Sequence, residues 1–598
     1  VNPFAAVCNQ RRPHITTVQQ YYRLFRKDSE PYIIGGTIWE NQDLGKGLYT
    51  VIDDLNIVPG ARLTLSPDTV LQFNNGLGML VQGELVRTEL HSSDEMVKFT
   101  STPFILPHQS NIRLVDENNS TKTLAGRLEV YVNNQWGTIC NRSWNKELAL
   151  LACNQLGLIM DPEYIENWQI FPSSGELPIV MDNIRCEENE YDITLCRHDG
   201  INHNIAVSCT STNVVGLRCM EPRWSGVRYS FLANPPLVTG QSSMEKWIIE
   251  KAGLFDFRLP MFSPALQIDW NCHSFHSLYI RDNFWNGIDI VYNDLTRKPA
   301  IRMSRFENNR RHGFKIRSQG ITIQKVINRV NEESDEDILL IDNIGKSNWS
   351  VRNDLINFPI LSVSNTLQLK YTRTYGKPSV IILVLFLDAQ EYLNRYVHIY
   401  QSEIISNQYA ISSIHYSNWT IKNDNNLLNR LASEKLWFQK VNFINNTEAI
   451  IWTHSPQHAI LSNAPIAKIS YHIDNCSITN NTGSIIESHH DLYNNANIYE
   501  WYFWSNTFAN NANSTVVIHL PYTINLRSQQ IHSLKMAENR FDNNTNFGIF
   551  LDGYYAFVNI SSNNFTNNNA PNEIGLITFN GMEKDLFFER NRLIYNRV

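Results

Sequence analysis

Cysteine is the residue type with the clearest chemistry in this chain, because six of its nine cysteines gather in one region. Thiols at such density form either disulfides or a metal site. A structural zinc site favours close Cys-x-x-Cys pairs, and this region has none. We therefore predict disulfides, which require an oxidising compartment, although the spacing alone leaves their pairing open. The six are Cys140, Cys153, Cys186, Cys196, Cys209 and Cys219.

The three remaining cysteines are scattered along the chain. Cys272 lies in an alternating run on the same side as Ile268, and Cys476 shares the side of Ile478. We expect both to be buried thiols that behave as small apolar side chains, with a disulfide partner as the alternative. Cys8 has no obvious partner, so its pairing stays open.

A second group of residues could support acid–base chemistry. Residues 311–317, Arg-His-Gly-Phe-Lys-Ile-Arg, resemble the His-Gly and Arg-Ile-Lys elements of pectin-degrading hydrolases, but in that family the two elements lie on different coils. Inverting glycoside hydrolysis needs paired carboxylates about 6.5–9.5 Å apart. Asp269, Asp282 and Asp289 stand singly. We therefore interpret these residues as surface charges, and expect no catalytic residue and no cofactor.

The element that must position all of these residues is a repeat. An apolar residue, any residue and then Asn-Asn recur at intervals of 24 to 35 residues from Phe443 to Leu593, as the residue numbers show. Such spacing is typical of a solenoid. The copies are Phe306–Asn309, Phe443–Asn446, Ile478–Asn481, Phe508–Asn511, Phe541–Asn544 and Phe565–Asn568, with looser copies at Phe284–Asn286 and Leu593–Asn596.

This unit fits one coil of a right-handed parallel β-helix. A short strand points alternate side chains inward, and Asn tolerates the left-handed backbone of a sharp turn. Equivalent Asn side chains, stacked at about 4.8 Å per coil, can form a hydrogen-bonded ladder. Asn445, Asn480 and Asn543 are also acceptors in Asn-x-Ser/Thr sequons, and a stacked Asn cannot carry a glycan. We predict that Asn480 and Asn543 belong to the ladder.

Other sequons predict N-glycans and, with the cysteines, a secreted ectodomain. The glycosylation candidates are Asn118, Asn119, Asn141, Asn348, Asn418, Asn513, Asn559 and Asn564.

Composition excludes several classes of protein. A net charge of −7 with 18% charged residues and no long basic run argues against nucleic-acid binding. The 42% hydrophobic and 11% aromatic residues argue against disorder. No apolar run approaches the about 20 residues of a membrane span, so we expect no membrane insertion by this chain. The chain begins at Val1 without a signal peptide, and we interpret it as a mature or excised piece of a longer protein.

Short alternating strands separated by Pro, Gly and Asn turns begin near Gly35. Residues 57–85 resemble the opening coils of secreted right-handed β-helix proteins. In those proteins a Trp-x-Gly strand usually follows, and here Trp224–Tyr229 fits, although it lies far downstream. We therefore predict an insert between these coils.

The insert resembles a scavenger receptor cysteine-rich (SRCR) domain of the six-cysteine kind. The resemblance rests on the cysteines and on motifs around them, and implies the pairs Cys140–Cys209, Cys153–Cys219 and Cys186–Cys196. The motifs are Gly126–Val130, Trp136–Cys140, Cys153–Gly157, Asp182–Cys186 and Gly216–Cys219.

Some SRCR domains hold a cation with an Asp-Asp pair after the first cysteine. Here those positions are Asn141 and Arg142, and the acidic residue expected before the last cysteine is replaced around Asn213 and Val214. A hard cation needs several anionic oxygens. We therefore predict no metal site in this domain.

The fold class we predict is mainly β: a parallel β-helix with an inserted small α+β SRCR domain and a possible second insert. That second insert resembles the β-sandwich CUB module, with decorated β-helix coils as the alternative. The segments are residues 1–30 as an N-terminal segment, 31–110 as first coils, 111–220 as SRCR domain, 221–330 as β-helix, 331–437 as the possible CUB-like insert, and 438–598 as β-helix.

The combination resembles large insect epithelial ectodomains that organise tricellular and septate junctions. This implies a non-enzymatic extracellular adhesion or scaffold module of a plasma-membrane protein, acting through other junctional cell-surface proteins or copies of itself. The alternative is a secreted β-helix that binds or cleaves a matrix polysaccharide. The sequence leaves open the binding surface, the choice of homophilic or heterophilic contacts, and the oligomeric state.

Overall fold

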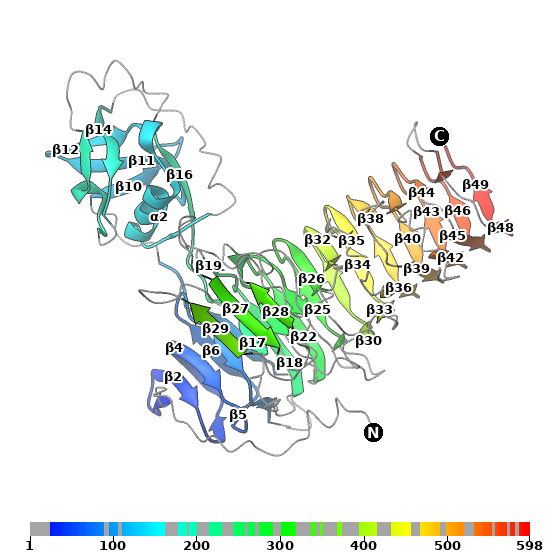
Figure 1. The fold of residues 1–598 in the computed structure, drawn as a ribbon, viewed down its shortest axis with the longest axis horizontal. Helices are drawn as coiled ribbons and strands as arrows, with labels where there is room; N and C mark the ends of the chain where they lie inside the picture. The colour runs from blue at the N-terminus through cyan, green and yellow to red at the C-terminus, as the bar shows by residue number, and fades with distance from the viewer. Residues whose placement is uncertain are drawn as a thin grey trace. The chain divides into compact units, whose positions relative to one another are not determined.

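Backbone hydrogen bonds between parallel strands join coil to coil along the larger of two units (Figure 1). That unit contains residues 1–100 and 224–598, and residues 101–223 form the smaller one. The computed structural model describes residues 24–88, 95–105, 111–161, 177–187, 190–199, 214–229, 243–256, 261–268, 274–290, 301–317, 337–342, 347–350, 368–372, 394–414, 432–455, 467–490, 498–519, 532–552, 556–570, 575–580 and 585–597.

Each later coil contributes a long strand, a short strand and a third strand, and each strand pairs in parallel with its equivalents on neighbouring coils. The long strands are β18 (Ser243–Glu250), β22 (Ser274–Arg281), β24 (Ile301–Arg302), β30 (Asn394–Tyr400), β33 (Ala432–Gln439), β36 (Ala467–Asp474), β39 (Ile498–Trp504), β42 (His532–Ala537), β45 (Ala556–Ser561) and β48 (Leu586–Glu589). The short strands are β25 (Arg305–Glu307), β31 (Glu403–Ile405), β34 (Asn442–Ile444), β37 (Ser477–Thr479), β40 (Thr507–Ala509), β43 (Arg540–Asp542), β46 (Asn564–Thr566) and β49 (Arg592–Ile594).

The third strands are β17 (Val227–Tyr229), β21 (Leu266–Ile268), β23 (Ile288–Ile290), β26 (His312–Arg317), β32 (Tyr409–Ile414), β35 (Ala449–Ser455), β38 (Ser484–His490), β41 (Val516–His519), β44 (Ile549–Asp552) and β47 (Ile577–Asn580). The first coils contain β1 (Phe25–Lys27), β2 (Tyr32–Ile38), β3 (Gln42–Leu44), β4 (Gly47–Ile57), β5 (Arg62–Leu65), β6 (Thr69–Phe73), β7 (Met79–Val81), β8 (Glu84–Arg87) and β9 (Val97–Ser101). The strand β1, inside the predicted N-terminal segment, pairs with β2 and so belongs to this unit.

Inward side chains of successive coils form continuous stacks, as predicted. Phe541 stacks on Phe508 at 4.6 Å between ring centroids and on Phe565 at 4.7 Å, and all three are fully buried. In the long strands, Tyr471 and Trp501 stack at 4.0 Å. Stacked aromatic pairs contribute about 0.5–1.5 kcal/mol beyond the apolar area that they bury.

The first Asn of each Asn-Asn pair has the left-handed backbone that the repeat predicts. Its φ is 55° at Asn445, 58° at Asn480, 57° at Asn510 and 53° at Asn543. The side chains of these residues are exposed. Asn480 and Asn543 therefore do not form the buried ladder, because their side chains point outward and the next residue points inward. The predicted stacking is confirmed only for Asn543, whose Nδ2 donates to Oδ1 of its equivalent Asn510 at 2.8 Å on the surface.

The second Asn of each pair forms the buried ladder, here called the Asn-Asn ladder. The Asn481 amide donates to Asn511 Oδ1 at 2.9 Å and to Phe443 O at 3.0 Å, while its own Oδ1 accepts from Asn446 N at 2.9 Å. Each rung thus satisfies backbone groups of a tight buried turn. The rungs among the described residues are Asn283, Asn309, Asn407, Asn446, Asn481, Asn511, Asn544, Asn568 and Asn596.

A second ladder, which we call the Asn-x-Phe ladder, lies at the other end of the short strands. Asn506 donates to Asn539 Oδ1 at 2.9 Å, Asn539 to Asn563 at 2.9 Å, and Asn563 to Asn591 at 3.0 Å. Cys476 N donates to Asn506 Oδ1 at 2.8 Å, so a cysteine occupies the rung position one coil earlier. The sequence analysis missed this ladder, although its signal is an Asn two residues before the repeated Phe.

Two repeat assignments need correction. The rung near residue 284 is Asn283 after Ile280, not Asn286 after Phe284, because Ile280 pairs with Phe306. Residues 394–414 form a complete coil, β30 to β32, whose rung is Asn407. The predicted insert at 331–437 is therefore wrong for these residues and for residues 432–437, which belong to β33, and the alternative of β-helix coils is confirmed there.

Between residues 331 and 393 the described residues form a small antiparallel sheet of β27 (Asp337–Asp342), β28 (Ser347–Ser350) and β29 (Gln368–Thr372). A hairpin of β19 (Phe255–Asp256) and β20 (Met261–Phe262) decorates another coil.

The predicted re-entry of the β-helix after the insert is confirmed, because β17 pairs in parallel with both β7 and β21. Glu250, which is 5% exposed, holds the β-helix residues on both sides of the insert. Its carboxylate accepts from Thr100 Oγ1 at 3.1 Å and Lys98 Nζ at 2.6 Å, and its carbonyl accepts from Trp224 Nε1 at 2.9 Å. Burial raises the pKa of Glu250, but its hydrogen bonds with Lys98 and Arg281 lower it overall.

The inserted unit is built on the strand order β13-β16-β11-β12-β14-β15, with β10 paired to β11. Asn145 caps its helix by accepting from Leu148 N at 2.9 Å. Its elements are β10 (Ile112–Val115), β11 (Ala125–Val132), β12 (Gln135–Ile139), η1 (Asn141–Ser143), α2 (Lys146–Gln155), β13 (Ile159–Met160), β14 (Ile179–Arg185), η3 (Ile193–Leu195), β15 (Arg197–Asp199) and β16 (Gly216–Met220).

A paired substitution tests the Asn-Asn ladder. Asn481→Ala leaves the backbone N–H of Asn446 and the carbonyl of Phe443 without these buried partners, so we expect unfolding free energy to fall by about 2–4 kcal/mol. Asn480→Gly keeps the left-handed turn and should leave the melting temperature near that of the native chain. Calorimetry measures both variants, and equal melting temperatures for the two would contradict the assignment of the ladder.

The Cys476 thiol offers a second test. It is buried and forms no disulfide, as predicted, and burial raises its pKa to about 12. We expect it to react with a thiol reagent at neutral pH only after unfolding. Cys476→Asn should extend the Asn-x-Phe ladder and stabilise the fold by about 0.5–1.5 kcal/mol relative to Cys476→Ala. An Asn variant that melts below the Ala variant would contradict the rung assignment.

Candidate functional site

Disulfides fix the SRCR unit, and two of the three implied pairs are confirmed. Cys153 in α2 joins Cys219 in β16, and Cys186 joins Cys196 after η3. Cys140 is disulfide-bonded, but Cys209, its implied partner, lies outside the described residues. Cys8 and Cys272 also lie outside them.

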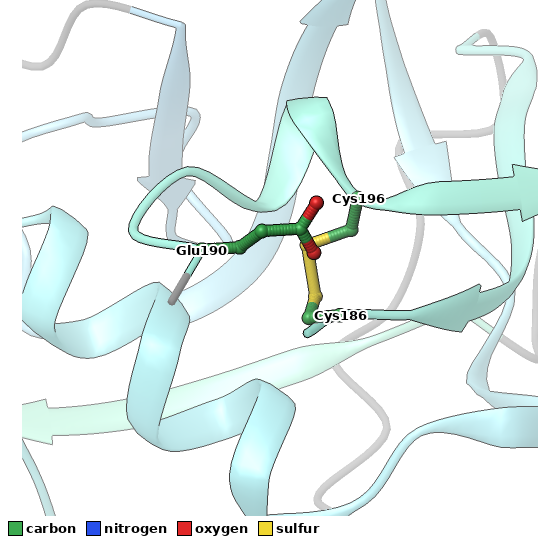
Figure 2. A group of neighbouring side chains, drawn as sticks. All are labelled: Cys186, Glu190 and Cys196. Carbon is green, nitrogen blue, oxygen red and sulfur yellow. A yellow bond between two sulfur atoms is a disulfide. The ribbon is translucent and has the colours of Figure 1, made fainter. Parts of the chain in front are cut away.

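Cys186, Glu190 and Cys196 form the one group of potential metal ligands found among the described residues (Figure 2). Both sulfurs are consumed by their mutual disulfide, so neither is a free thiolate. The Glu190 carboxylate accepts from Glu187 N at 2.7 Å and closes the intervening loop. The donor set therefore suits a disulfide loop and not a metal ion.

The position where some SRCR domains hold a cation is occupied by an arginine side chain. The Arg142 guanidinium pairs with Asp182, whose side chain is fully buried. Asp182 also accepts from Asn183 N at 2.8 Å. Val214 is 2% exposed and bridges Cys140, whereas Asn213 lies outside the described residues. The side chain at the second of these positions is thus a cation paired with a buried carboxylate.

The disulfide loop from Cys186 to Cys196 presents two large exposed side chains. Tyr191 is 82% exposed and Leu195 is 75% exposed. The sequence analysis did not identify them, because exposure cannot be read from residue type in so short a loop.

Hydrogen bonds between the loop and the rest of the domain hold this loop in place. Asp192 accepts from two side chains outside the loop, Asn111 Nδ2 at 2.6 Å and Gln155 Nε2 at 2.8 Å, and from Thr194 N within the loop at 2.9 Å. Burial raises the pKa of Asp192, but these hydrogen bonds together lower it overall. The carboxylate therefore stays ionised and anchors the loop at neutral pH.

The hydrolase-like residues do not converge on one site. His312 is only 7% exposed and lies on the inward side of β26 with Phe314, whereas Lys315 is on the opposite side. Burial, followed by the charges of Lys315 and Arg311, lowers the pKa of His312 well below its usual value. The interpretation of His312 as a surface charge is therefore wrong, and the same holds for the buried Asp289.

The aspartates are equally dispersed. Asp289 is 5% exposed and lies beside Lys315 in the neighbouring strand. Asp282 lies instead at an exposed left-handed turn, with φ 55°, next to Asn308. Asp269 lies outside the described residues.

The glycosylation candidates differ in accessibility. Asn118, Asn119 and Asn513 are exposed, whereas Asn141, Asn559 and Asn564 are half-buried. The Asn348 side chain and all of Asn418 lie outside the described residues. In the part of the chain that the structure describes, no helix is both long and apolar enough to cross a membrane.

Comparison with known proteins identifies one domain. Residues 118–220 match the family described as scavenger receptor cysteine-rich domain. The third SRCR domain of murine neurotrypsin is 35% identical, with a TM-score of 0.14, over 18% of this chain and 94% of that one.

Along the whole chain, similarity extends to the protein bark beetle of Drosophila melanogaster. The two are 25% identical over 719 aligned positions, which cover 96% of this chain but only 22% of that protein. A family 28 exopolygalacturonase from Yersinia enterocolitica aligns with 93% of this chain and 72% of its own, at 8% identity and with a TM-score of 0.22. The chain is therefore a homologue of a segment of bark beetle, with an SRCR domain inserted in a parallel β-helix.

Proposed function

We propose that this chain is an extracellular adhesion or scaffold module of an epithelial cell-surface protein, which organises tricellular junctions through protein contacts. The observation that carries the proposal is the homology to bark beetle along nearly the whole chain. The chain spans about a fifth of that relative, so the role concerns a module of a larger protein.

The physical properties of the two units support this role. A β-helix whose turns are tied by two amide ladders is stiff along its axis, which suits the spacing of surfaces across a cell gap. Disulfides Cys153–Cys219 and Cys186–Cys196 suit an oxidising extracellular compartment.

The contact point that we propose is the disulfide loop bearing Tyr191 and Leu195. Binding energy concentrates in a few large side chains that can be desolvated, and a rigid loop loses little entropy on binding. Tyr191 and Leu195 meet both conditions, since they are exposed and the segment 190–196 that carries them is held by Asp192 and by the disulfide.

We also propose that the chain has no enzymatic activity and no cofactor. The inward orientation of His312 and the separation of Asp282 from Asp289 support this view over polysaccharide cleavage. We likewise propose that Arg142 replaces a cation in the SRCR domain.

The adhesion role is tested by displaying the chain on non-adherent epithelial-derived cells and mixing them with cells that carry junctional surface proteins or the same chain. We expect clustering and enrichment of the chain at contacts. The double variant Tyr191→Ser with Leu195→Ser should reduce clustering at least about tenfold, because it removes two exposed apolar anchors.

Two controls accompany this assay. Leu48→Ser removes an exposed apolar side chain from a strand of the β-helix, where we expect no loss. Unchanged clustering by the loop variant would refute the contact point, and turnover of a polyuronate by the native chain would refute the non-enzymatic proposal.

The Arg142 proposal has its own test. Arg142→Ala leaves the buried Asp182 carboxylate without its charged partner, so we expect loss of about 1–3 kcal/mol of stability at neutral pH. Arg197→Ala breaks an exposed pair with Glu187 and should cost about 0–1 kcal/mol. Calorimetry with and without calcium measures both, and a calcium-dependent rise in the native melting temperature would contradict the proposal.

A further inference from the structure

The exposed side of the Asn-Asn turns forms an edge along the β-helix with its own chemistry. We call it the turn edge and define it by the left-handed first Asn of each pair. All six of these Asn side chains are exposed, whereas the adjacent ladder Asn is buried on every coil. The turn edge consists of Asn308, Asn445, Asn480, Asn510, Asn543 and Asn567.

The fold does not depend on these outward amides. Backbone N–H groups make the hydrogen bonds that join neighbouring coils along this edge. Asn445 N donates to Thr479 O at 3.4 Å, and Asn480 N donates to Ala509 O at 3.2 Å. The buried second Asn supplies the side-chain hydrogen bonds to the turn. The first Asn contributes its tolerance of a left-handed backbone and leaves its side chain to solvent.

Three positions of the turn edge stand in complete sequons, with the buried ladder Asn as the middle residue. These are Asn445-Asn446-Thr447, Asn480-Asn481-Thr482 and Asn543-Asn544-Thr545. The threonines at all three sites are exposed as well. Asn543 stacks on Asn510 at the surface, where its Nδ2 donates to Asn510 Oδ1 at 2.8 Å. The expectation that stacking excludes a glycan does not apply here, because both side chains are exposed and a glycosylated Asn retains one N–H for such a bond.

We propose that Asn445, Asn480 and Asn543 carry N-linked oligosaccharides, so that the turn edge is a glycan-covered edge. The glycans follow one line along the axis, because the three residues occupy the same position on successive or nearby coils. Bulky hydrated glycans exclude proteins from this edge and leave the other surfaces for partners. The proposal requires passage through a secretory compartment and does not rest on the adhesion role.

The occupancy test uses the chain secreted from mammalian cells. Enzymatic release of N-glycans in heavy-oxygen water converts each modified Asn into a labelled Asp, which peptide mass spectrometry locates. We expect label at Asn445, Asn480 and Asn543 and none at Asn481 or Asn544. Absence of label from all three positions in the secreted chain would overturn the proposal, whatever the outcome of the adhesion assay.

A matched gain of a site tests the outward geometry. Asn510 has the same turn but lacks a sequon, because Ala512 stands where a threonine is needed. We expect Ala512→Thr to add one glycan at Asn510 without loss of secretion, and Ala512→Val to serve as the control of equal size.

The opposite result is expected at a buried rung. Ala570→Thr creates a sequon at Asn568, which is 1% exposed, and Ala570→Val again controls for size. We expect chains glycosylated at Asn568 to be retained in the cell, while the Val variant is secreted. The assignment of Asn510 as outward and Asn568 as inward would be overturned if folded chains with a glycan at Asn568 were secreted at the same yield as chains with a glycan at Asn510.

Discussion

Satisfying the buried polar groups of the turns is the constraint on which the rest of this structure depends. A β-helix coil must reverse direction sharply beside its core, where water cannot reach the backbone. Each ladder Asn accepts from the backbone and amide of one coil and donates to the next, as Asn511 does between Asn481 and Asn544. The ladder therefore stabilises each coil only in the presence of its neighbours. Stability is therefore shared between neighbouring coils, as expected for a solenoid.

Buried hydrogen bonds also hold the β-helix together where the SRCR domain is inserted. The chain leaves after β9 and returns at Trp224, and Glu250 binds groups on both sides of the gap. Trp224 also stacks on Phe73 at 4.4 Å, within the core of the first coils. The β-helix core is thus continuous beneath the insertion point. The SRCR unit has stabilising features of its own, namely two disulfides and a capped helix.

Much of the fold could be predicted from the sequence, because periodic residues report periodic structure. The repeat at Phe541–Asn544 predicts the coil, the left-handed turn and the existence of an Asn ladder. It does not show which Asn of the pair points inward, since both are the same residue type and only the backbone φ distinguishes them. The coil at residues 394–414 was missed because Ser406 replaces the first Asn of the pair, although Ile404 and Asn407 fit the repeat.

The candidate sites were less accessible to sequence reasoning. Disulfide pairing followed from a family resemblance, and spacing alone would not have selected it. The inward position of His312 depends on where β26 begins, which a short motif does not fix. The exposure of Tyr191 and Leu195 depends on how η3 sits over Asp192, and no pattern in the chain reports that packing.

Native-state hydrogen exchange on the whole chain tests the central claim most directly. If buried Asn ladders hold the coils, the backbone amides of Asn446, Asn481, Asn511 and Asn544 exchange only through large-scale opening, as slowly as the core strands β36 and β39. Exchange of these four amides as fast as in the unfolded chain would contradict the account.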